Sequence, residues 1–420
     1  MACSFPSNAR HTSCWTAYDS LSSESTVRPF CVPAKWPQQA PHARRRSHEV
    51  GDYHQARPCT TDPGPIACLP HTPPVKAGWA VSAGTRMPNG LRIGNLDLDV
   101  PFYQAPLSGY SDRAMRRLAR RFGCPLTFTG VLLDKVALHR GAMRKLHLQP
   151  VPEESPVGAQ ILGADPQTMA QAAAVLEQVG FCAIDLNFAC PAPKVLRRGR
   201  GGALLDHPRR ILEIYQRVRD AVSVPVLVKL RIGVDSGPAS REGFWEICER
   251  LASERPDALV IHGRTVGKMY RGRADWALLG EVKQRFTDQI IIGSGDLMTP
   301  QDVARRIHTS GLDGVAIARG AIGNPWIFRD CRALLAGQAP APPPTLEEVG
   351  EVMLQHLEWI LELYPEHKAV PFFRKFAAHY SKRHPRRKAA LPDLMAAKTA
   401  EQVRQAIRHW FNGQAEECPA

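Results

Sequence analysis

The sequence predicts an α/β protein: a (β/α)8 barrel of the TIM type, followed by a small all-helical C-terminal domain. The first observation is an alternation that begins near residue 100, where short apolar runs are followed by amphipathic stretches of helical length. The second is that this alternation supplies eight apolar runs over roughly 230 residues, as such a barrel requires. The third is that no G-x-G-x-x-G follows the first run, which disfavours the alternative, a doubly wound open sheet.

The expected strands are short and bounded by turn residues or by helical patterns. They lie at residues 101–107, 125–133, 156–162, 183–187, 225–233, 258–264, 290–296 and 314–320. The segment 165–180 is typical of the helices between them, because Asp165 is a good N-cap and Pro166 occupies the first helical position.

The pattern changes after Phe328. A Pro- and Ala-rich linker leads into helical periodicity that continues to about residue 412, with Thr345 as the expected N-cap of the first helix. We therefore expect a barrel at residues 93–335 and a helical domain at residues 345–412.

Residues 1–86 differ from the rest of the chain. Pro, Ser, His and Arg are scattered through them without apolar periodicity, so we expect a disordered extension, or a start site assigned upstream of Met87. No run of eighteen apolar residues predicts a transmembrane helix, and the N-terminus lacks the apolar core of a secretory signal. A cytoplasmic protein is the expectation.

The chain is basic, with 54 Lys and Arg against 40 Asp and Glu and a net charge of +14. A solvated basic surface and a polyanionic partner both explain this charge, and only its clustering can decide between them. The eleven cysteines contain no C-x-x-C spacing, which indicates free thiols and no metal site.

The active sites of such barrels lie at the carboxyl ends of the strands. The polar residues at those ends are Gln160, Asn187, Cys190, Lys229, Arg231, His262, Arg264, Asp296 and Arg319. Backbone N–H groups in the loops 293–296 and 318–325, together with Arg319, can hold a phosphate, and flavin mononucleotide (FMN) fits such a site. Each residue alone also has a purely structural explanation; their convergence favours function.

Seven segments, taken in order, resemble the tRNA-dihydrouridine synthase family over about residues 93–412. They are "APLSGYSDRAMRRLARRFG" (105–123), "GAQILGADPQTMAQAA" (158–173), "IDLNFACPAPKVLRRGRGGALL" (184–205), "VPVLVKLRIG" (224–233), "IHGRTVGKMYRGRADW" (261–276), "GSGDL" (293–297) and "IARGAIGNPWIF" (317–328). The resemblance implies an FMN-dependent oxidoreductase of tRNA processing that reduces the C5–C6 bond of particular tRNA uridines with NADPH as electron donor.

The resemblance also implies roles for individual residues. Cys190, in the family's Cys-Pro motif, would be the general acid that protonates C5 of the uracil. FMN would contact Pro106, Leu107, Ser108, Gln160, Lys229, His262, Ser294, Gly295, Asp296, Ala318 and Arg319. The tRNA substrate would contact Asn187, Lys194, Arg197, Arg198, Arg264, Arg374 and Lys375.

The last two residues belong to the segment 368–388, which contains eight Lys and Arg and no acid. Its aromatic residues at positions 372, 373, 376 and 380 follow helical spacing and are expected in the core, with the basic side chains outside, where they can contact RNA. We expect no membrane partner and no obligate protein partner.

The chain departs from the family pattern at three positions. Gly130 stands where the second strand usually carries an acid, Ser294 replaces a usual Asn, and Ala189 replaces the Gly before the Cys-Pro pair. Two alternatives therefore stay open: a small-molecule flavin reductase on the same barrel, and a tRNA-binding relative without catalysis. The sequence does not indicate which uridine is reduced or how many copies of the chain assemble.

Overall fold

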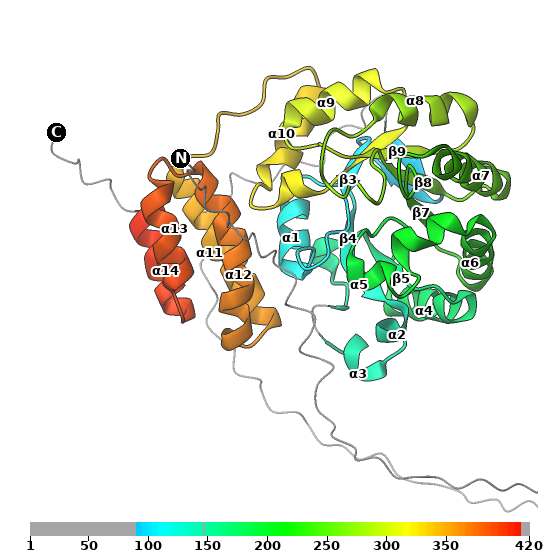
Figure 1. Cartoon of the computed structure of the whole chain (residues 1–420). Helices are drawn as coiled ribbons and strands as arrows, with labels where there is room; N and C mark the ends of the chain where they lie inside the picture. The colour runs from blue at the N-terminus through cyan, green and yellow to red at the C-terminus, as the bar shows by residue number, and fades with distance from the viewer. Residues whose placement is uncertain (1–89, 146–147, 413–420) are drawn as a thin grey trace, which may run out of the picture. The chain divides into compact units, whose positions relative to one another are not determined.

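The computed structural model describes residues 90–145 and 148–412. The predicted disorder of residues 1–86 lies outside these residues. Within the described ranges, eight parallel strands close into a barrel in the order β10-β3-β4-β5-β6-β7-β8-β9, surrounded by helices, and a group of helices follows at the C-terminus (Figure 1). The predicted fold class is confirmed.

The barrel strands are shorter than the sequence pattern suggested. They are β3 (Phe102–Gln104), β4 (Thr127–Leu133), β5 (Val157–Leu162), β6 (Ile184–Asn187), β7 (Val226–Arg231), β8 (Ala258–His262), β9 (Ile291–Ser294) and β10 (Gly314–Ile317). The helices that accompany them are α1 (Arg113–Arg121), α2 (Asp134–Ala137), α3 (Arg140–Met143), α4 (Pro166–Val179), α5 (Pro193–Leu196), α6 (Pro208–Ala221), α7 (Pro238–Glu254), α8 (Trp276–Arg285), α9 (Pro300–Thr309) and α10 (Trp326–Leu335).

Helix α4 shows how local sequence sets an element's ends. The Asp165 side chain accepts from the backbone N–H of Thr168 at 2.8 Å, and Pro166 takes the first helical position, as predicted. The helix ends at Gly180, whose φ of 106° is a left-handed conformation that favours glycine.

Alternation along the strands separates the two sides of the barrel wall. In β7, Val226, Val228 and Leu230 face the surrounding helices, whereas Leu227 points into the barrel, and β8 alternates in the same way. The interior is apolar toward the amino ends of the strands and polar toward their carboxyl ends, where Lys229 of β7 lies. The apolar half supports the fold, and the polar half is available for chemistry.

A two-stranded hairpin that the sequence pattern did not predict packs against the apolar half. It consists of β1 (Leu91–Ile93) and β2 (Leu96–Leu98), paired antiparallel. Leu91, Ile93 and Leu98 join the same apolar cluster as the interior residues of the barrel strands. Strands of three residues carry too little periodicity to be recognised from sequence.

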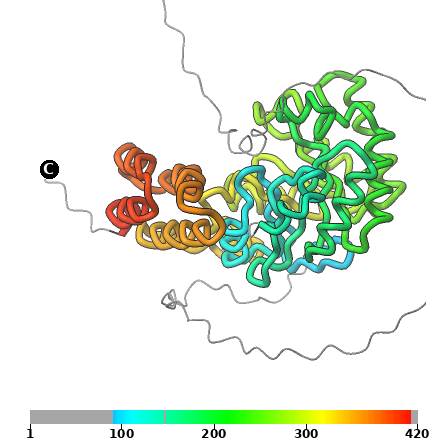
Figure 2. Tube along the Cα trace, turned by 90° about the horizontal axis from the view of Figure 1, so that it is seen from below, coloured from blue at the N-terminus to red at the C-terminus, as the bar shows by residue number. Residues whose placement is uncertain are grey.

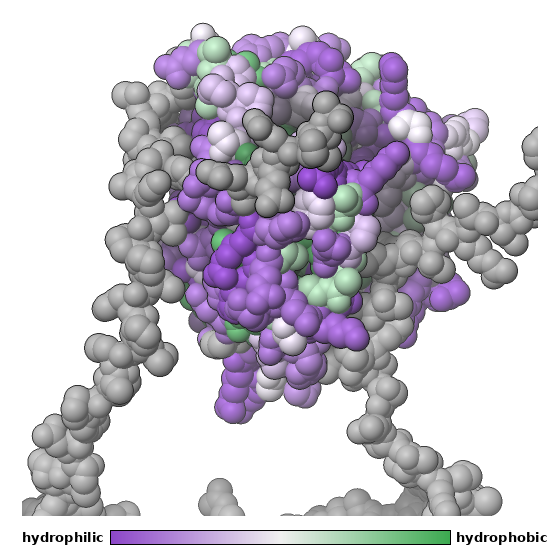
Figure 3. Space-filling model, turned by 90° about the vertical axis from the view of Figure 1, so that its left-hand side faces the viewer, coloured by the Kyte–Doolittle hydropathy of each residue, from purple (hydrophilic) through white to green (hydrophobic). Residues whose placement is uncertain are grey.

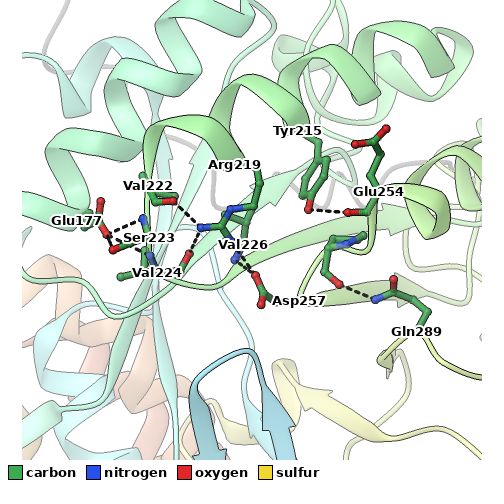
Figure 4. A network of polar contacts seen from close by, with 11 residues as sticks. Glu177, Tyr215, Arg219, Val222, Ser223, Val224, Val226, Glu254, Asp257 and Gln289 are labelled. Carbon is green, nitrogen blue, oxygen red and sulfur yellow. Dashed lines mark hydrogen bonds and ion pairs between the residues drawn. The ribbon is translucent and has the colours of Figure 1, made fainter.

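Polar contacts tie the amino ends of the strands together (Figure 4). Arg219 of α6 forms an ion pair with Asp257 at 3.0 Å, and Asp257 accepts from the backbone N–H of Val226 at 2.8 Å. On the other side, Glu177 of α4 accepts from the hydroxyl of Ser223 at 2.6 Å. Because this network lies at the end opposite the polar interior, we assign it to stability.

The C-terminal helices are α11 (Leu346–Leu363), α12 (Glu366–Tyr380), α13 (Arg387–Ala396) and α14 (Ala400–Ile407), which form a group of their own in Figure 2. Thr345 caps α11 with a capping box, as predicted. The helical periodicity expected up to about residue 412 is interrupted between α13 and α14. Thr399 starts a new helix there, because its side chain accepts from the backbone N–H of Gln402.

Side-chain contacts connect these helices with the barrel. Arg117 of α1 pairs with Glu362 of α11 at 2.9 Å and lies 4.2 Å from the ring centre of Trp359. Lys375 of α12 donates to the carbonyl of Gly109, in the loop after β3. No helix in the described part of the chain is long and apolar enough to cross a membrane.

Candidate active site

The predicted site residues of four neighbouring strands lie side by side at the carboxyl end of the barrel. Asn187 of β6 is in register with Lys229 of β7. Arg231 of β7 is in register with His262 of β8, which in turn is in register with Ser294 of β9. Parallel pairing in register therefore brings residues that are far apart in sequence to one barrel mouth.

A chain of side-chain hydrogen bonds runs through the mouth. The Nε2 of Gln160 donates to Asp185 at 2.8 Å, and the Oε1 of Gln160 accepts from Asn187 at 2.8 Å. The Oδ1 of Asn187 accepts from the backbone N–H groups of Ala189 and Cys190, both at 3.0 Å. Both ends of the Gln160 amide are thus engaged by protein groups.

Cys190 lies immediately after this chain and is half-buried. Burial raises the pKa of its thiol above the ordinary 9.0, although a backbone hydrogen bond at Ala192 and the charge of Arg231 act to lower it. The thiol is therefore protonated at neutral pH. Gly201 and Gly202 pass so close that a Cβ on either would lie 3.0 or 3.1 Å from atoms of Cys190, which explains the glycines in this loop.

Lys229 carries a buried ammonium group. Its Nζ has no hydrogen-bond partner among the residues that the structure describes. Burial lowers the pKa of Lys229 to about 8; the charge of Asp185 acts to raise it and that of Arg231 to lower it further. A buried cation without a hydrogen-bond partner, at the mouth of a barrel, indicates that an anionic or polar ligand group completes its surroundings.

His262 faces the same space among several cations. Burial lowers the pKa of His262 well below 6.5, and the charges of Arg231, Lys229, Arg264 and Arg319 lower it further. The imidazole is therefore neutral at physiological pH. It lies 3.4 Å from the guanidinium of Arg264 and offers a hydrogen-bonding edge rather than a charge.

The ends of β9 and β10 form the other side of the mouth. Asp296 pairs with Arg264 at 2.5 Å and lies 3.7 Å from Arg319. Its second oxygen accepts from the N–H of Ala274 at 2.8 Å. Burial acts to raise the pKa of Asp296, but these hydrogen bonds and charges outweigh it and lower the pKa. Asp296 and Gly295 both have positive φ angles, of 54° and 127°, so the turn here is tight.

The remaining residues expected near FMN flank this mouth. Pro106 and Leu107, after β3, are half-buried and Ser108 is exposed; after β9 and β10, Ser294 is buried and Ala318 is half-buried. They follow the strand ends that border the mouth, and their contact with FMN stays a prediction.

Arg231 stands out in sequence only by its strand-end position, and the structure shows a central role for it. Its guanidinium donates to the carbonyls of Ala189 at 2.8 Å, Thr265 at 2.9 Å and Met269 at 2.8 Å. It also lies 5.8 Å from the ring centre of Tyr270. One buried arginine therefore ties the loop of Cys190 to the loop after β8. The sequence offers one signal of this role: an arginine at the end of a mostly apolar strand is unusual, because arginine is rarely buried without a partner.

Arg264 was expected to contact tRNA, but its guanidinium is directed inward. The residue is 2% exposed, and it donates to the carbonyls of Arg271 at 3.2 Å and Gly272 at 2.6 Å in addition to Asp296. It therefore shapes the loop after β8, and its guanidinium is not at the surface.

The basic loop after Cys190 does reach the surface. Lys194, Arg197 and Arg198 are all exposed, on and directly after the short helix α5. Arg200, which follows them, is half-buried and 4.0 Å from Asp134. Neighbouring cations at the surface are groups of the kind that contact phosphates, so the prediction that this loop binds tRNA stays a prediction.

The two predicted tRNA contacts in α12 are engaged within the protein. Arg374 donates to the carbonyl of Ala397 at 2.8 Å, and Lys375 donates to the carbonyl of Gly109 and lies 3.2 Å from the ring centre of Phe372. The exposed cations of the segment lie on either side of these two residues: Lys368, Lys382, Arg383, Arg386, Arg387 and Lys388. Figure 3 shows a mainly hydrophilic surface with scattered apolar side chains.

The structure explains why position 130 carries no side chain. A Cβ at this position would lie 3.2 Å from the carbonyl oxygen of Leu107, and its own N–H donates to the carbonyl of Ser111 at 3.1 Å. The loop after β3 therefore rests against the backbone of β4, in space that a side chain would fill.

Comparison with known proteins agrees with this arrangement. The family described as dihydrouridine synthase (Dus) matches residues 103–412. The tRNA-dihydrouridine synthase B of Shewanella oneidensis is 32% identical over 322 residues, covering 77% of this chain and 98% of that protein. The corresponding enzyme of Vibrio cholerae is 31% identical over 325 residues, covering 77% of this chain and 100% of that protein. Because the family match spans most of the chain and relatives match over nearly their whole length, this protein belongs to the dihydrouridine synthase family.

Proposed function

We propose that this protein is a tRNA-dihydrouridine synthase, which reduces the C5–C6 double bond of particular uridines in tRNA. The observation that carries the proposal is the convergence of Cys190, Lys229 and His262 at one barrel mouth in a chain of this family. A thiol that keeps its proton, a buried cation and a neutral imidazole are the groups that a reductive step of this kind needs from the protein.

We propose FMN as the resident cofactor. The ammonium of Lys229, which has no hydrogen-bond partner among the described residues, suits the electron-rich edge of a flavin ring, and the neutral His262 suits a hydrogen bond to it. At the other end, Arg319 and the tight turn at Gly295 suit a phosphate. The expected contacts of the flavin are Pro106, Leu107, Ser108, Gln160, Lys229, His262, Ser294, Gly295, Asp296, Ala318 and Arg319. When bound, the flavin supplies the hydride, and NADPH is the proposed donor that restores it.

The protein's own part in the reaction is to hold and deliver a proton. Reduction of the C5–C6 bond adds a hydride to C6 and a proton to C5, so an acid must face C5. Cys190 fits this role because its raised pKa keeps Sγ protonated at neutral pH. We propose that Asn187, its neighbour in the hydrogen-bond chain, also contacts the uracil edge, through the amide hydrogen that it does not donate to Gln160.

We further propose two domains, a barrel at residues 93–335 and a helical domain at residues 345–412, that bind tRNA together. Lys194, Arg197 and Arg198 would contact phosphates next to the target uridine, which must leave the base stack to reach the mouth. Arg264, Arg374 and Lys375 would act indirectly, because each donates to groups within the protein and holds a nearby segment in place.

The test is mass spectrometry of tRNA nucleosides, mapped by position, after incubation of unmodified tRNA with the purified protein, FMN and NADPH. We expect dihydrouridine at defined positions with the wild type, and nearly none with Cys190→Ala, which should still bind flavin and tRNA. Retained binding of tRNA without product from the wild type would instead support a non-catalytic tRNA-binding protein. Flavin reduction without tRNA binding would support a small-molecule reductase.

A further inference from the structure

Asp185 is a buried carboxylate that none of the roles above uses. It lies in β6, two residues before Asn187, is 0% exposed and points into the barrel with Asn187. Oδ2 accepts from Gln160 at 2.8 Å, and Oδ1 has no hydrogen-bond partner within the described residues. Burial raises the pKa of Asp185 to about 6, against the charge of Lys229 and the Gln160 hydrogen bond, so the group is ionised at neutral pH. Because a buried carboxylate loses its hydration, its presence calls for an explanation.

The hydrogen bonds that run from Asp185 through Gln160 and Asn187 to Cys190 can have only one donor-to-acceptor direction. An ionised carboxylate can only accept, so Gln160 must present its NH2 group to Asp185. The Oε1 of Gln160 then faces Asn187, which must present its own NH2 group. The Oδ1 of Asn187 is left to accept from the backbone N–H groups of Ala189 and Cys190, and a backbone N–H can only donate.

Both ends of the chain therefore require the same orientation of the two amides. If Gln160 turned over, its oxygen would face the oxygen of Asp185, and its NH2 group would face the NH2 group of Asn187. If Asn187 turned as well, the N–H groups of Ala189 and Cys190 would face a donor. Because a buried N–H left without an acceptor is costly, the carboxylate selects one arrangement strongly.

We propose that Asp185 is a positioning residue: by accepting from Gln160 it orients the amides of Gln160 and Asn187, and so holds the backbone of Ala189 and Cys190 in the conformation that presents the thiol. The inference rests on the proposed function, because it takes Cys190 as the acid. This role explains why a buried carboxylate accepts a hydrogen bond from the uncharged amide of Gln160.

Two substitutions distinguish the role of Asp185 as a hydrogen-bond acceptor from the effect of its negative charge. Asp185→Asn keeps an oxygen that can accept from Gln160 but removes the negative charge that faces Lys229. Asp185→Leu removes both and keeps a similar volume. Thr127→Val is the matched control, because the hydroxyl of Thr127 is also buried in the barrel wall and has no hydrogen-bond partner in the part of the chain that the structure describes.

The experiment is amide hydrogen exchange by mass spectrometry on the full chain with FMN bound. In Asp185→Leu we expect the amides of Ala189 and Cys190 to exchange roughly tenfold faster or more, because each loses an ordered acceptor. Pro191 has no N–H, so few other amides dilute the signal. Asp185→Asn and Thr127→Val should exchange like the wild type. Turnover of Asp185→Leu should fall by about 10²-fold in kcat with KM for tRNA unchanged.

Three results would overturn the inference: wild-type exchange at these amides in Asp185→Leu, an equal rise in Asp185→Asn, or a rise spread over the whole barrel. If Asp185→Leu does not fold, Gln160→Met cuts the next link and must show the same local rise. Exchange that changes as expected in a protein that makes no dihydrouridine would support the orienting role of Asp185 but overturn the proposed function and, with it, the role of Cys190 as acid. Dihydrouridine formed by the wild type, together with unchanged exchange in the variants, would support the proposed function and overturn the inference about Asp185.

Discussion

The guanidinium of Arg231 donates to the carbonyl oxygen of Ala189 at 2.8 Å, one residue before the thiol at position 190. The same group donates to Thr265 and Met269 in the loop after β8. Two loops that lie far apart in sequence are thereby held by one buried cation. The position of Cys190 thus depends on a residue that need not touch the substrate.

Arg231→Met should lower kcat by about 10²-fold, because even a displacement of about 1 Å in a reacting group costs on this order. The measurement is steady-state dihydrouridine formation on unmodified tRNA. Arg305→Met is the control, since Arg305 is exposed on α9 and pairs with Asp302 one turn away. Equal turnover in the two variants would show that Arg231 has no part in positioning Cys190.

The pH profile of kcat should be flat through neutrality and fall only at alkaline pH. Burial raises the pKa of Cys190 above 9.0, so the acid form is complete well below that pH and is lost as pH rises through the raised pKa. Because the charge of Arg231 lowers this pKa, Arg231→Met should move the alkaline limb to still higher pH. Because the pKa of Lys229 is about 8, the decisive variant is Lys229→Met: an alkaline limb below pH 9.0 that persists in it would contradict this assignment.

Lys229→Met should weaken flavin binding by roughly 10- to 100-fold, in line with about 1.5–3 kcal/mol for a charged hydrogen bond. It should also change the pH dependence of stability of the flavin-free protein. The unfolded chain keeps the Lys229 proton up to about its ordinary pKa of 10.5, whereas the folded pKa is about 8. Between these values the unfolded state binds more protons, so wild-type stability rises with pH relative to Lys229→Met. Urea unfolding at about pH 7.5 and about pH 10 tests this; parallel changes in the two proteins would refute it.

Arg197→Ala combined with Arg198→Ala should weaken tRNA binding mainly at low salt. Each phosphate contact contributes a slope of roughly one to the dependence of log K on log salt, so the double variant should lose up to about two. Binding titrations from about 50 to about 200 mM salt measure the slope. An unchanged slope would show that this loop makes no phosphate contacts. Arg305→Ala, at the exposed position already used as a control, is the distant control.

Asp257→Asn should lower the free energy of unfolding by about 1–3 kcal/mol and leave kcat unchanged. Asp257 accepts from Arg219 and from the N–H of Val226 at the amino ends of the strands (Figure 4), away from the barrel mouth. Denaturant unfolding and turnover, measured on the same preparation, separate the two effects. A large loss of kcat at full stability would place this network in the catalytic machinery.

The architecture of this protein can be predicted from periodicity along the chain. Alternating apolar runs and helical segments predict the barrel, and caps such as Asp165 and Thr345 are correctly placed because they depend on neighbours three residues away. The hairpin formed by β1 and β2 and the break before Thr399 are not predicted. Their local patterns are too short to outweigh the propensities around them.

The chemical groups of the site are also legible in the linear chain, since strand-end position and motif order single out Cys190, Lys229 and His262. The task of each polar group emerges only when the chain is folded. Arg264 and Arg374 turn inward to backbone carbonyls, Arg231 joins two loops, and Asp185 orients an amide chain. This is because a side chain's partners come from strands and loops distant in sequence. Charge and spacing along one chain do not specify which donor will meet which acceptor.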